Sequence, residues 1–205
     1  MKKFLKRFDF RFHPVSILPL LFVLLTYPAM KWLPVHFCYE NALLENFQLI
    51  VLLGTFVACI KAKTDKKFFY SLALVCVILF LREINCGRTI FFAVPGVENQ
   101  FYSWKEIKYG WLAHPLYGAF IAGSALYFII TKSFKVLFKY IMKAKFSVYN
   151  WLFLFFGIIF GLIGEEIGNP QMEEMAETTF YLALFALIYL QAFHTDYIEA
   201  ADDKD

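Results

Sequence analysis

The sequence is short of charge, of turn-forming residues and of catalytic motifs. Asp, Glu, Lys and Arg make up 18% of its 205 residues, whereas about 25% is usual in soluble domains. Ten glycines and seven prolines are too few for a low-complexity linker. The sequence has no HExxH, GxSxG or phosphate-binding loop. These absences exclude a disordered tail, a coiled coil and a soluble enzyme.

Apolar and aromatic residues dominate instead. The chain is 60% hydrophobic and 20% aromatic, and its mean hydropathy is +0.56. One membrane crossing needs about 20 apolar residues, and unpaired backbone groups are too costly in hydrocarbon, so each crossing should be a helix. We therefore expect an all-α integral membrane protein, a single domain over residues 1–205 with a bundle of six transmembrane helices. The expected helices are 15–34, 42–60, 68–81, 111–131, 149–164 and 179–193.

The basic residues predict the orientation of the bundle. Fourteen of the 20 Lys and Arg residues lie in segments 1–13, 61–67 and 132–148, on one side of the expected membrane. By the positive-inside rule this side is cytoplasmic, so both termini should be cytoplasmic. The expected pieces are a basic N-terminus (1–14), a long outer loop (82–110), a cytoplasmic amphipathic segment (132–148) and an acidic cytoplasmic tail (195–205).

The amphipathic segment predicts a helix that lies on the membrane surface. Lysines from Lys132 to Lys143 recur at helical spacing, with Phe134, Leu137 and Ile141 between them. Such a helix binds anionic lipid with its basic face. A basic patch would also suit nucleic acid, but the cytoplasmic leaflet already accounts for the charge. The expected partner is therefore the lipid bilayer, with no nucleic acid.

Acidic residues gather at the outer helix ends. Glu45 and Gln48 share one stripe of the second helix, and Glu173, Glu177 and Tyr181 share one face of the sixth. Ionisable groups at membrane depth usually face the bundle interior or a wet cavity. We therefore expect an outer pocket that binds a ligand, a cation or a partner. Its expected residues are Glu45, Gln48, Glu83, Arg88, His114, Glu166 and Glu177.

Other interpretations of these residues stay open. Glu near a helix N-terminus stabilises the helix dipole, and Arg82 or Arg88 can simply neutralise Glu83. Carboxylates with a histidine also ligate hard or borderline cations, so a divalent metal is possible although no cofactor is specified. The Glu-x-x-His motif of di-metal bundles is absent.

Small residues and cysteines give two further expectations. Gly157 and Gly161 form a GxxxG pair, which favours close helix packing, either within the monomer or at an oligomer or partner-subunit interface. Cys38 and Cys86 both fall on the expected outer side. An oxidising compartment would allow them to pair, and two free thiols are the alternative.

The strings YENALLENFQ and LREINCGRTIF carry one resemblance. They are similar to a pattern in uncharacterised bacterial multi-pass inner-membrane proteins. In that pattern an acidic residue and Gln open one helix, and a Glu-Ile-x-x-Gly-Arg/Gln turn with aromatics closes the next. The resemblance implies the bacterial cytoplasmic (inner) membrane and no particular activity. The sequence departs from the pattern at Cys86, where the family has Trp.

Three classes of function compete. The first is a non-catalytic inner-membrane subunit or sensor that binds a ligand, cation or partner at the outer acidic/His pocket. The others are a small oligomeric transporter or channel, and a metal-dependent membrane enzyme acting on a lipid or quinone. The small size and the lack of a catalytic motif favour the first class. A transporter should show an internal repeat, and the sequence shows none.

Overall fold

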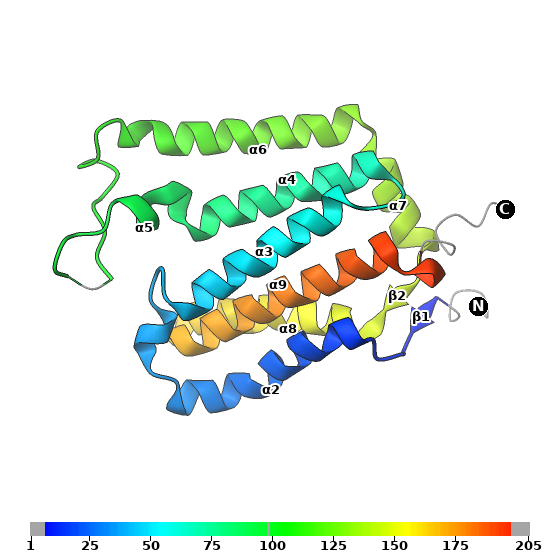
Figure 1. Ribbon diagram of the computed structural model, residues 1–205, viewed down its shortest axis with the longest axis horizontal. Helices are drawn as coiled ribbons and strands as arrows, with labels where there is room; N and C mark the ends of the chain where they lie inside the picture. Colours follow the sequence, from blue (N-terminus) through cyan, green and yellow to red (C-terminus); the bar gives the residue numbers. More distant parts are fainter. Residues whose placement is uncertain (1–6, 98, 198–205) are drawn as a thin grey trace.

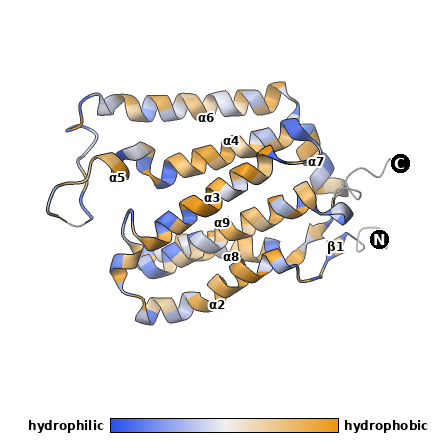
Figure 2. Cartoon of the chain, in the orientation of Figure 1, coloured by the Kyte–Doolittle hydropathy of each residue, from blue (hydrophilic) through white to orange (hydrophobic). Residues whose placement is uncertain are grey.

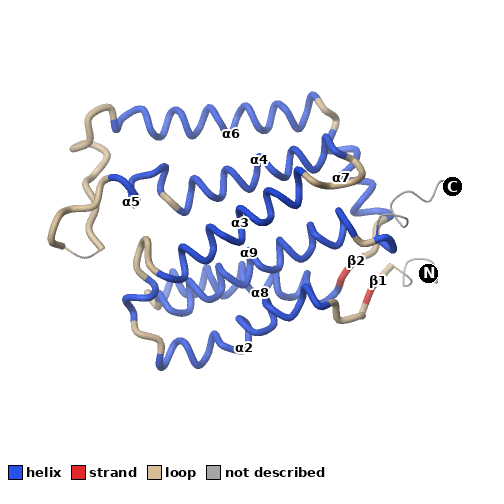
Figure 3. Tube along the Cα trace, viewed as in Figure 1, coloured by secondary structure: helices blue, strands red, loops and turns tan. Residues whose placement is uncertain are grey.

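The computed structural model describes residues 7–97 and 99–197, and this part of the chain is predominantly helical (Figures 1 and 3). Five helices are long and apolar enough to cross a membrane, or six if the bent pair of α4 with the short helices after it counts as one span. Figure 2 shows apolar residues along most of their length and polar residues gathered toward their ends. The all-α fold class is confirmed. The long helices are α2 (Ile17–Trp32), α3 (Leu43–Ile60), α4 (Lys66–Glu83), α6 (Ala113–Ile130), α8 (Val148–Ile167) and α9 (Pro170–Phe193).

Helix α9 is the centre of the packing. It contacts α2, α3 and α8, while α3 also packs on α4, and α4 on α6 (Figure 1). Helix α9 begins at Pro170, well before the expected start at residue 179. Proline suits a first helical turn, and the Asn169 side chain accepts a hydrogen bond from Met172 N at 2.9 Å. These capping residues extend the helix through its polar turns, so the acidic residues lie on α9 itself.

Two glycines of α8 allow its close approach to α9. A Cβ atom at Gly157 would lie 2.7 Å from the backbone nitrogen of Phe180, and one at Gly164 would lie 2.6 Å from that of Glu173. At Gly161 the nearest atom would be Glu177 Cγ at 3.8 Å, an ordinary contact. The tight positions are therefore Gly157 and Gly164, spaced by two helical turns, while Gly161 has room for a methyl group.

The other elements are short or peripheral. None of the residues of α6, all in the described part of the chain, is buried. Helix α7 (Ser133–Lys143) runs across the long helices at one end of the bundle (Figure 1). Its Val136 and Tyr140 pack against the cluster around Phe68 and Phe69, whereas Phe134, Leu137 and Ile141 are exposed. The remaining elements are η1 (Pro14–Ser16), η2 (Val35–Cys38), η3 (Asn85–Gly87), α5 (Arg88–Phe91), η4 (Gly110–Leu112), β1 (Phe8–Asp9) and β2 (Phe146–Ser147).

The chain bends by 55° between α4 and the short helices η3 and α5. Cys86 and Gly87 both have positive φ there, at 53° and 90°. All four cysteines lie in the described ranges and are free thiols. The possible Cys38–Cys86 disulfide is therefore not formed in this structure. Cys38 is instead buried in an apolar cluster with Ala29, Leu44 and Met175.

The two ends of the described chain meet at one end of the bundle (Figure 1). Strand β1 pairs in parallel with β2, with Asp9 opposite Ser147. Asp9 accepts hydrogen bonds from Arg11 Nη2 at 2.8 Å and from the Tyr197 hydroxyl at 3.1 Å, and His13 Nε2 lies 3.3 Å from it. We call Asp9, Arg11, His13 and Tyr197 the terminal cluster. Residues 1–6 of the expected basic N-terminus and 198–205 of the expected acidic tail lie outside the described residues.

The terminal cluster predicts a measurable acid dependence. Burial would raise the pKa of Asp9, but the hydrogen bonds from Arg11, Tyr197 and His13 outweigh it and hold that pKa well below its usual range. The ionised Asp9 carboxylate therefore stabilises the fold fully above its unfolded-state pKa of about 3.9. This stabilisation is lost as the pH falls through the lower pKa that Asp9 has in the folded protein. We expect Asp9→Asn to cost about 1.5–3 kcal/mol at pH 7 and to remove this acid dependence. Thermal unfolding at pH 7 and pH 3 measures both effects.

Glu106→Gln is the matched control. Glu106 is an exposed loop carboxylate whose pKa is lowered mainly by the Ser103 backbone N–H. Its replacement should leave thermal stability at pH 7 nearly unchanged. Equal stability of Asp9→Asn and the wild type at pH 7 would show that the terminal cluster does not stabilise the fold.

Candidate functional site

The beginning of α3, the end of α4 and the beginning of α9 lie at the end of the bundle opposite the chain termini (Figure 1), and their polar side chains are in contact. Helix α3 contributes its first-turn stripe, α4 its last turn, and α9 its first three turns. The N-terminal turns of α9 face α3, α4 and α8 at once, so polar residues on several of its faces are buried against neighbours. We call this set the polar cluster. It comprises Glu45, Gln48, Arg82, Glu83, Glu174, Glu177, Thr178 and Tyr181.

Arg82 is the only cation of the polar cluster. Its Nη2 donates to Glu83 Oε1 at 2.9 Å and to Glu177 Oε1 at 2.9 Å. The Tyr181 hydroxyl donates to the same Glu83 oxygen at 2.6 Å. The Glu83 side chain is only 8% exposed, whereas that of Arg82 is 53% exposed. Two contacts therefore join α4 to α9, the ion pair of Arg82 with Glu177 and the hydrogen bond from Tyr181 to Glu83.

Gln48 joins α3 to α9. Its Nε2 donates to Glu174 Oε2 at 2.8 Å and to Thr178 Oγ1 at 3.1 Å. One turn earlier on α3, Glu45 Oε2 accepts a hydrogen bond from the backbone N–H of Asn41. Gln48 is fully buried and Glu45 is 5% exposed. Both are held in place by contacts that use only part of their hydrogen-bonding capacity.

Two buried acceptors of this cluster are left over. Glu45 Oε1 and Gln48 Oε1 have no hydrogen-bond partner among the described residues. Glu45 is also within electrostatic range of Glu83 and Glu177. The polar cluster thus contains four carboxyl groups and one guanidinium, and nearby carboxylates repel unless a cation or a proton lies among them. The arrangement is suited to a ligand that brings positive charge and N–H or O–H donors.

A metal ion fits this arrangement poorly. Within residues 7–97 and 99–197, no group of three or more His, Cys, Asp or Glu side chains is placed to hold one. Gln48 and Arg82 already donate hydrogen bonds to three of the four carboxylates, namely Glu174, Glu83 and Glu177. An organic cation can instead donate separate hydrogen bonds to individual carboxylate oxygens of the cluster.

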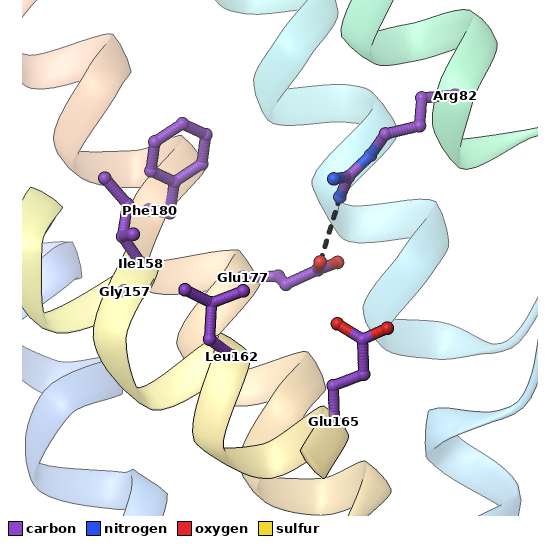
Figure 4. Close-up of a pocket in the computed structure, with 8 residues that line it drawn as sticks. Arg82, Gly157, Ile158, Leu162, Glu165, Glu177 and Phe180 are labelled. Carbon is purple, nitrogen blue, oxygen red and sulfur yellow. Dashed lines mark hydrogen bonds and ion pairs between the residues drawn. The ribbon is translucent and has the colours of Figure 1, made fainter.

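A cavity of about 180 Å³ lies beside the polar cluster (Figure 4). Its polar end holds Arg82, Glu177 and Glu165, with the Glu165 carboxylate pointing toward the Arg82–Glu177 pair. Apolar residues of α8 and α9 form the rest of its wall. The lining consists of Arg82, Gly157, Ile158, Gly161, Leu162, Glu165, Glu177 and Phe180.

Three expected pocket residues lie elsewhere. Arg88 is 4.0 Å from the exposed Glu40 carboxylate and lies over the Phe101 ring. His114 is exposed, with its ring centroid 5.9 Å from that of Trp104. Glu166 is exposed at the end of α8. The structure thus groups Glu45, Gln48, Glu83 and Glu177 and leaves out the expected histidine.

Five polar residues of the site lie outside the pocket expected from the sequence. Arg82 was expected to pair with a pocket carboxylate but not to belong to the pocket, and Glu174, Thr178, Tyr181 and Glu165 were not assigned to it. The sequence could have indicated Glu174 and Thr178 together, because a spacing of four residues puts both on one face of α9. Nothing in the sequence indicates Glu165, since the direction of its side chain depends on where α8 packs.

Comparisons with protein-family models, with curated proteins and with solved structures found no match for this chain. The function is therefore argued from the site itself.

Proposed function

We propose that this chain is a multi-pass protein of the bacterial inner membrane, with six crossing segments and both termini cytoplasmic. The span count takes α4 with η3 and α5 as one bent segment. The position of both described chain ends at one end of the bundle supports an even number of crossings (Figure 1). The bias of Lys and Arg toward that end supports its cytoplasmic assignment, with α7 at the lipid surface.

Reporter fusions test this topology. Alkaline phosphatase fused after residue 205 should be inactive, because its disulfides do not form in the cytoplasm. The same reporter inserted at Gly96, in the loop at the opposite end, should be active. A green fluorescent reporter should give the reverse pattern. Phosphatase activity at residue 205 would contradict the proposed orientation.

We further propose that the protein is a non-catalytic subunit or sensor that binds a cationic ligand at the polar cluster, working as an oligomer or with a partner subunit. The observation that carries this is the pair of buried, unpartnered oxygens, Glu45 Oε1 and Gln48 Oε1. A buried acceptor without a donor costs about 1–3 kcal/mol, which a ligand donor would recover. The polar groups lie at one end of the bundle, which favours binding over passage through the midplane.

Ligand-induced stabilisation tests the proposed binding. Purified protein in detergent is titrated with ethanolamine hydrochloride, NaCl or MgCl₂ while thermal unfolding is followed by tryptophan fluorescence. We expect ethanolamine to stabilise the wild type in a saturable manner, by about 2.7 kcal/mol at one hundred times Kd. NaCl at equal ionic strength corrects for screening.

Glu45→Gln and Glu106→Gln form the matched pair of variants. Glu45→Gln keeps the Asn41 contact but removes the charge, so it should fold and lose the response to ethanolamine. Glu106→Gln, far from the polar cluster in the exposed loop, should respond as the wild type does. A response that persists in Glu45→Gln, or a wild type insensitive to the cations, would refute the proposed function.

A further inference from the structure

The cavity beside the polar cluster is a groove that opens sideways. It lies between α8 and the end of α4, with Glu177 and Phe180 of α9 as its floor. Two of its walls, Ile158 and Leu162, belong to the exposed face of α8. In the proposed topology this face is covered by lipid rather than water. A molecule can therefore enter the groove from the bilayer without crossing the bundle.

The groove changes from polar to apolar along its length. Glu165 and Gly157 mark its two ends on α8, eight residues apart, which is about 12 Å along a helix. Glu177 lies beside Gly161, between these two ends, and pairs with Arg82 near the end of α4. The other end is lined by Gly157, Ile158 and Phe180. This order matches a lipid whose headgroup lies at the membrane boundary and whose acyl chain points inward.

Atoms of the groove that have no hydrogen-bond partner indicate which lipid headgroup would fit. In the part of the chain that the structure describes, the Glu165 carboxylate has no partner, and Glu177 uses only Oε1. Arg82 donates through Nε and Nη2, which leaves Nη1 free. A primary ammonium has three N–H donors, enough to bridge Glu165 and Glu177. The Nη1 group can donate to a phosphate oxygen.

The charge balance disfavours an anionic headgroup. Glu83, Glu165 and Glu177 bring three negative charges to the single positive charge of Arg82. A phosphatidylglycerol headgroup would add a further negative charge to this surplus. A phosphocholine headgroup is zwitterionic, but its quaternary ammonium has no N–H to donate. A phosphate ester with a primary ammonium satisfies both the free carboxylates and the free Nη1 group.

We infer that the groove between α4 and α8 binds a membrane lipid with a phosphoethanolamine headgroup. This lipid site goes beyond the proposed function, because it shares Arg82 and Glu177 with the polar cluster but uses neither Glu45 Oε1 nor Gln48 Oε1. The ammonium lies between Glu165 and Glu177, and the phosphate lies on Arg82 Nη1. Because the cavity is smaller than the pockets that enclose drug-sized molecules, it holds the headgroup and the start of one chain. The remaining hydrocarbon lies along the exposed face of α8.

Lipid retention measures this selectivity. The protein is purified from nanodiscs that contain equal amounts of phosphatidylethanolamine, phosphatidylcholine and phosphatidylglycerol with identical chains. Native mass spectrometry then quantifies the lipid that stays bound. We expect phosphatidylethanolamine to be enriched about tenfold, as one charge-assisted hydrogen bond would give. Stepwise N-methylation of the headgroup should reduce this enrichment as donors are lost.

Two variants and a matched control locate the site. Gly161→Leu fills the groove from a position where a Cβ meets only Glu177 Cγ at 3.8 Å, so it should abolish the enrichment. Gly118→Leu places the same side chain on α6, where a Cβ meets nothing within 4 Å, and should retain it. Glu165→Gln changes an exposed residue, cannot disturb the core, and should reduce the enrichment severalfold.

The outcomes separate this inference from the proposed function. Equal retention of the three lipids, or enrichment that survives both Gly161→Leu and Glu165→Gln, would overturn the lipid inference. If ethanolamine still stabilises the wild type through Glu45, the proposed function stands without the lipid site. If neither lipid nor ethanolamine binds, both fail.

Discussion

Replacing Arg82 with alanine is expected to destabilise the protein by about 3 kcal/mol. The change strands Glu83 and Glu177, and a buried charge that loses its partner costs about 3–5 kcal/mol. We place the loss at the lower end because the Arg82 side chain is itself half exposed. For a chain of this size the loss corresponds to a fall in melting temperature of about 6–12 °C. Thermal unfolding of the purified protein measures it.

Two further variants identify the cause. Arg82→Ala combined with Glu177→Gln should regain part of the lost stability, because one stranded charge is removed. Arg88→Ala should cost no more than about 1 kcal/mol, since the nearest carboxylate, Glu40, is 4.0 Å away and exposed. An Arg82→Ala protein as stable as Arg88→Ala would show that the polar cluster does not hold α4 to α9.

Gly157→Ala is expected to separate α8 from α9. The new methyl group would lie 2.7 Å from Phe180 N and 2.8 Å from Ala176 O, so backbone atoms have to move. Overpacking of this kind costs about 1–3 kcal/mol or more. Because the contact between α8 and α9 is the most extensive in the structure, we expect the largest loss among single-methyl changes. Unfolding of the purified variant, compared with wild type, gives the loss directly.

Gly161→Ala is the control on the same helix. Both replacements gain about 1 kcal/mol of helix propensity, so the difference between them isolates the steric effect. Gly161→Ala has room for its methyl group and should match or exceed the stability of the wild type. Two alanine variants of equal stability would mean that α8 packs on α9 in another register.

The sequence was sufficient to predict the all-α fold and its long apolar helices. Hydropathy identifies such segments because length and composition alone decide whether a helix can cross a membrane. The helix boundaries were harder to predict. α9 begins early since Asn169 and Pro170 favour a helix start, a signal that lies outside the apolar run. Which helix is central could not be predicted, because apolar residues surround every helix.

The site was predicted in part, for a geometric reason. Glu45, Gln48 and Glu177 were selected from their positions along the helices, and the structure groups them with Glu83. His114 and Glu166 were selected in the same way and point elsewhere. Neighbouring residues on a helix differ by about 100° in direction, so Glu165 lines the cavity and Glu166 does not. The position of a residue along a helix predicts how deep in the bundle it lies. The direction of its side chain can be predicted only when the neighbouring helix is known.

The central position of α9 has a consequence for biosynthesis. Chains leave the ribosome N-terminus first, and α9 is the last long helix in the described part of the chain. Helices α2 and α8 make their largest contacts with it, so in the proposed membrane topology both lack that partner until α9 is synthesised. Until then Arg82 has only its neighbour Glu83 as an ion-pair partner. A ribosome that stalls before Pro170 would leave an intermediate with unpacked helices, a feature that membrane quality-control proteases can recognise.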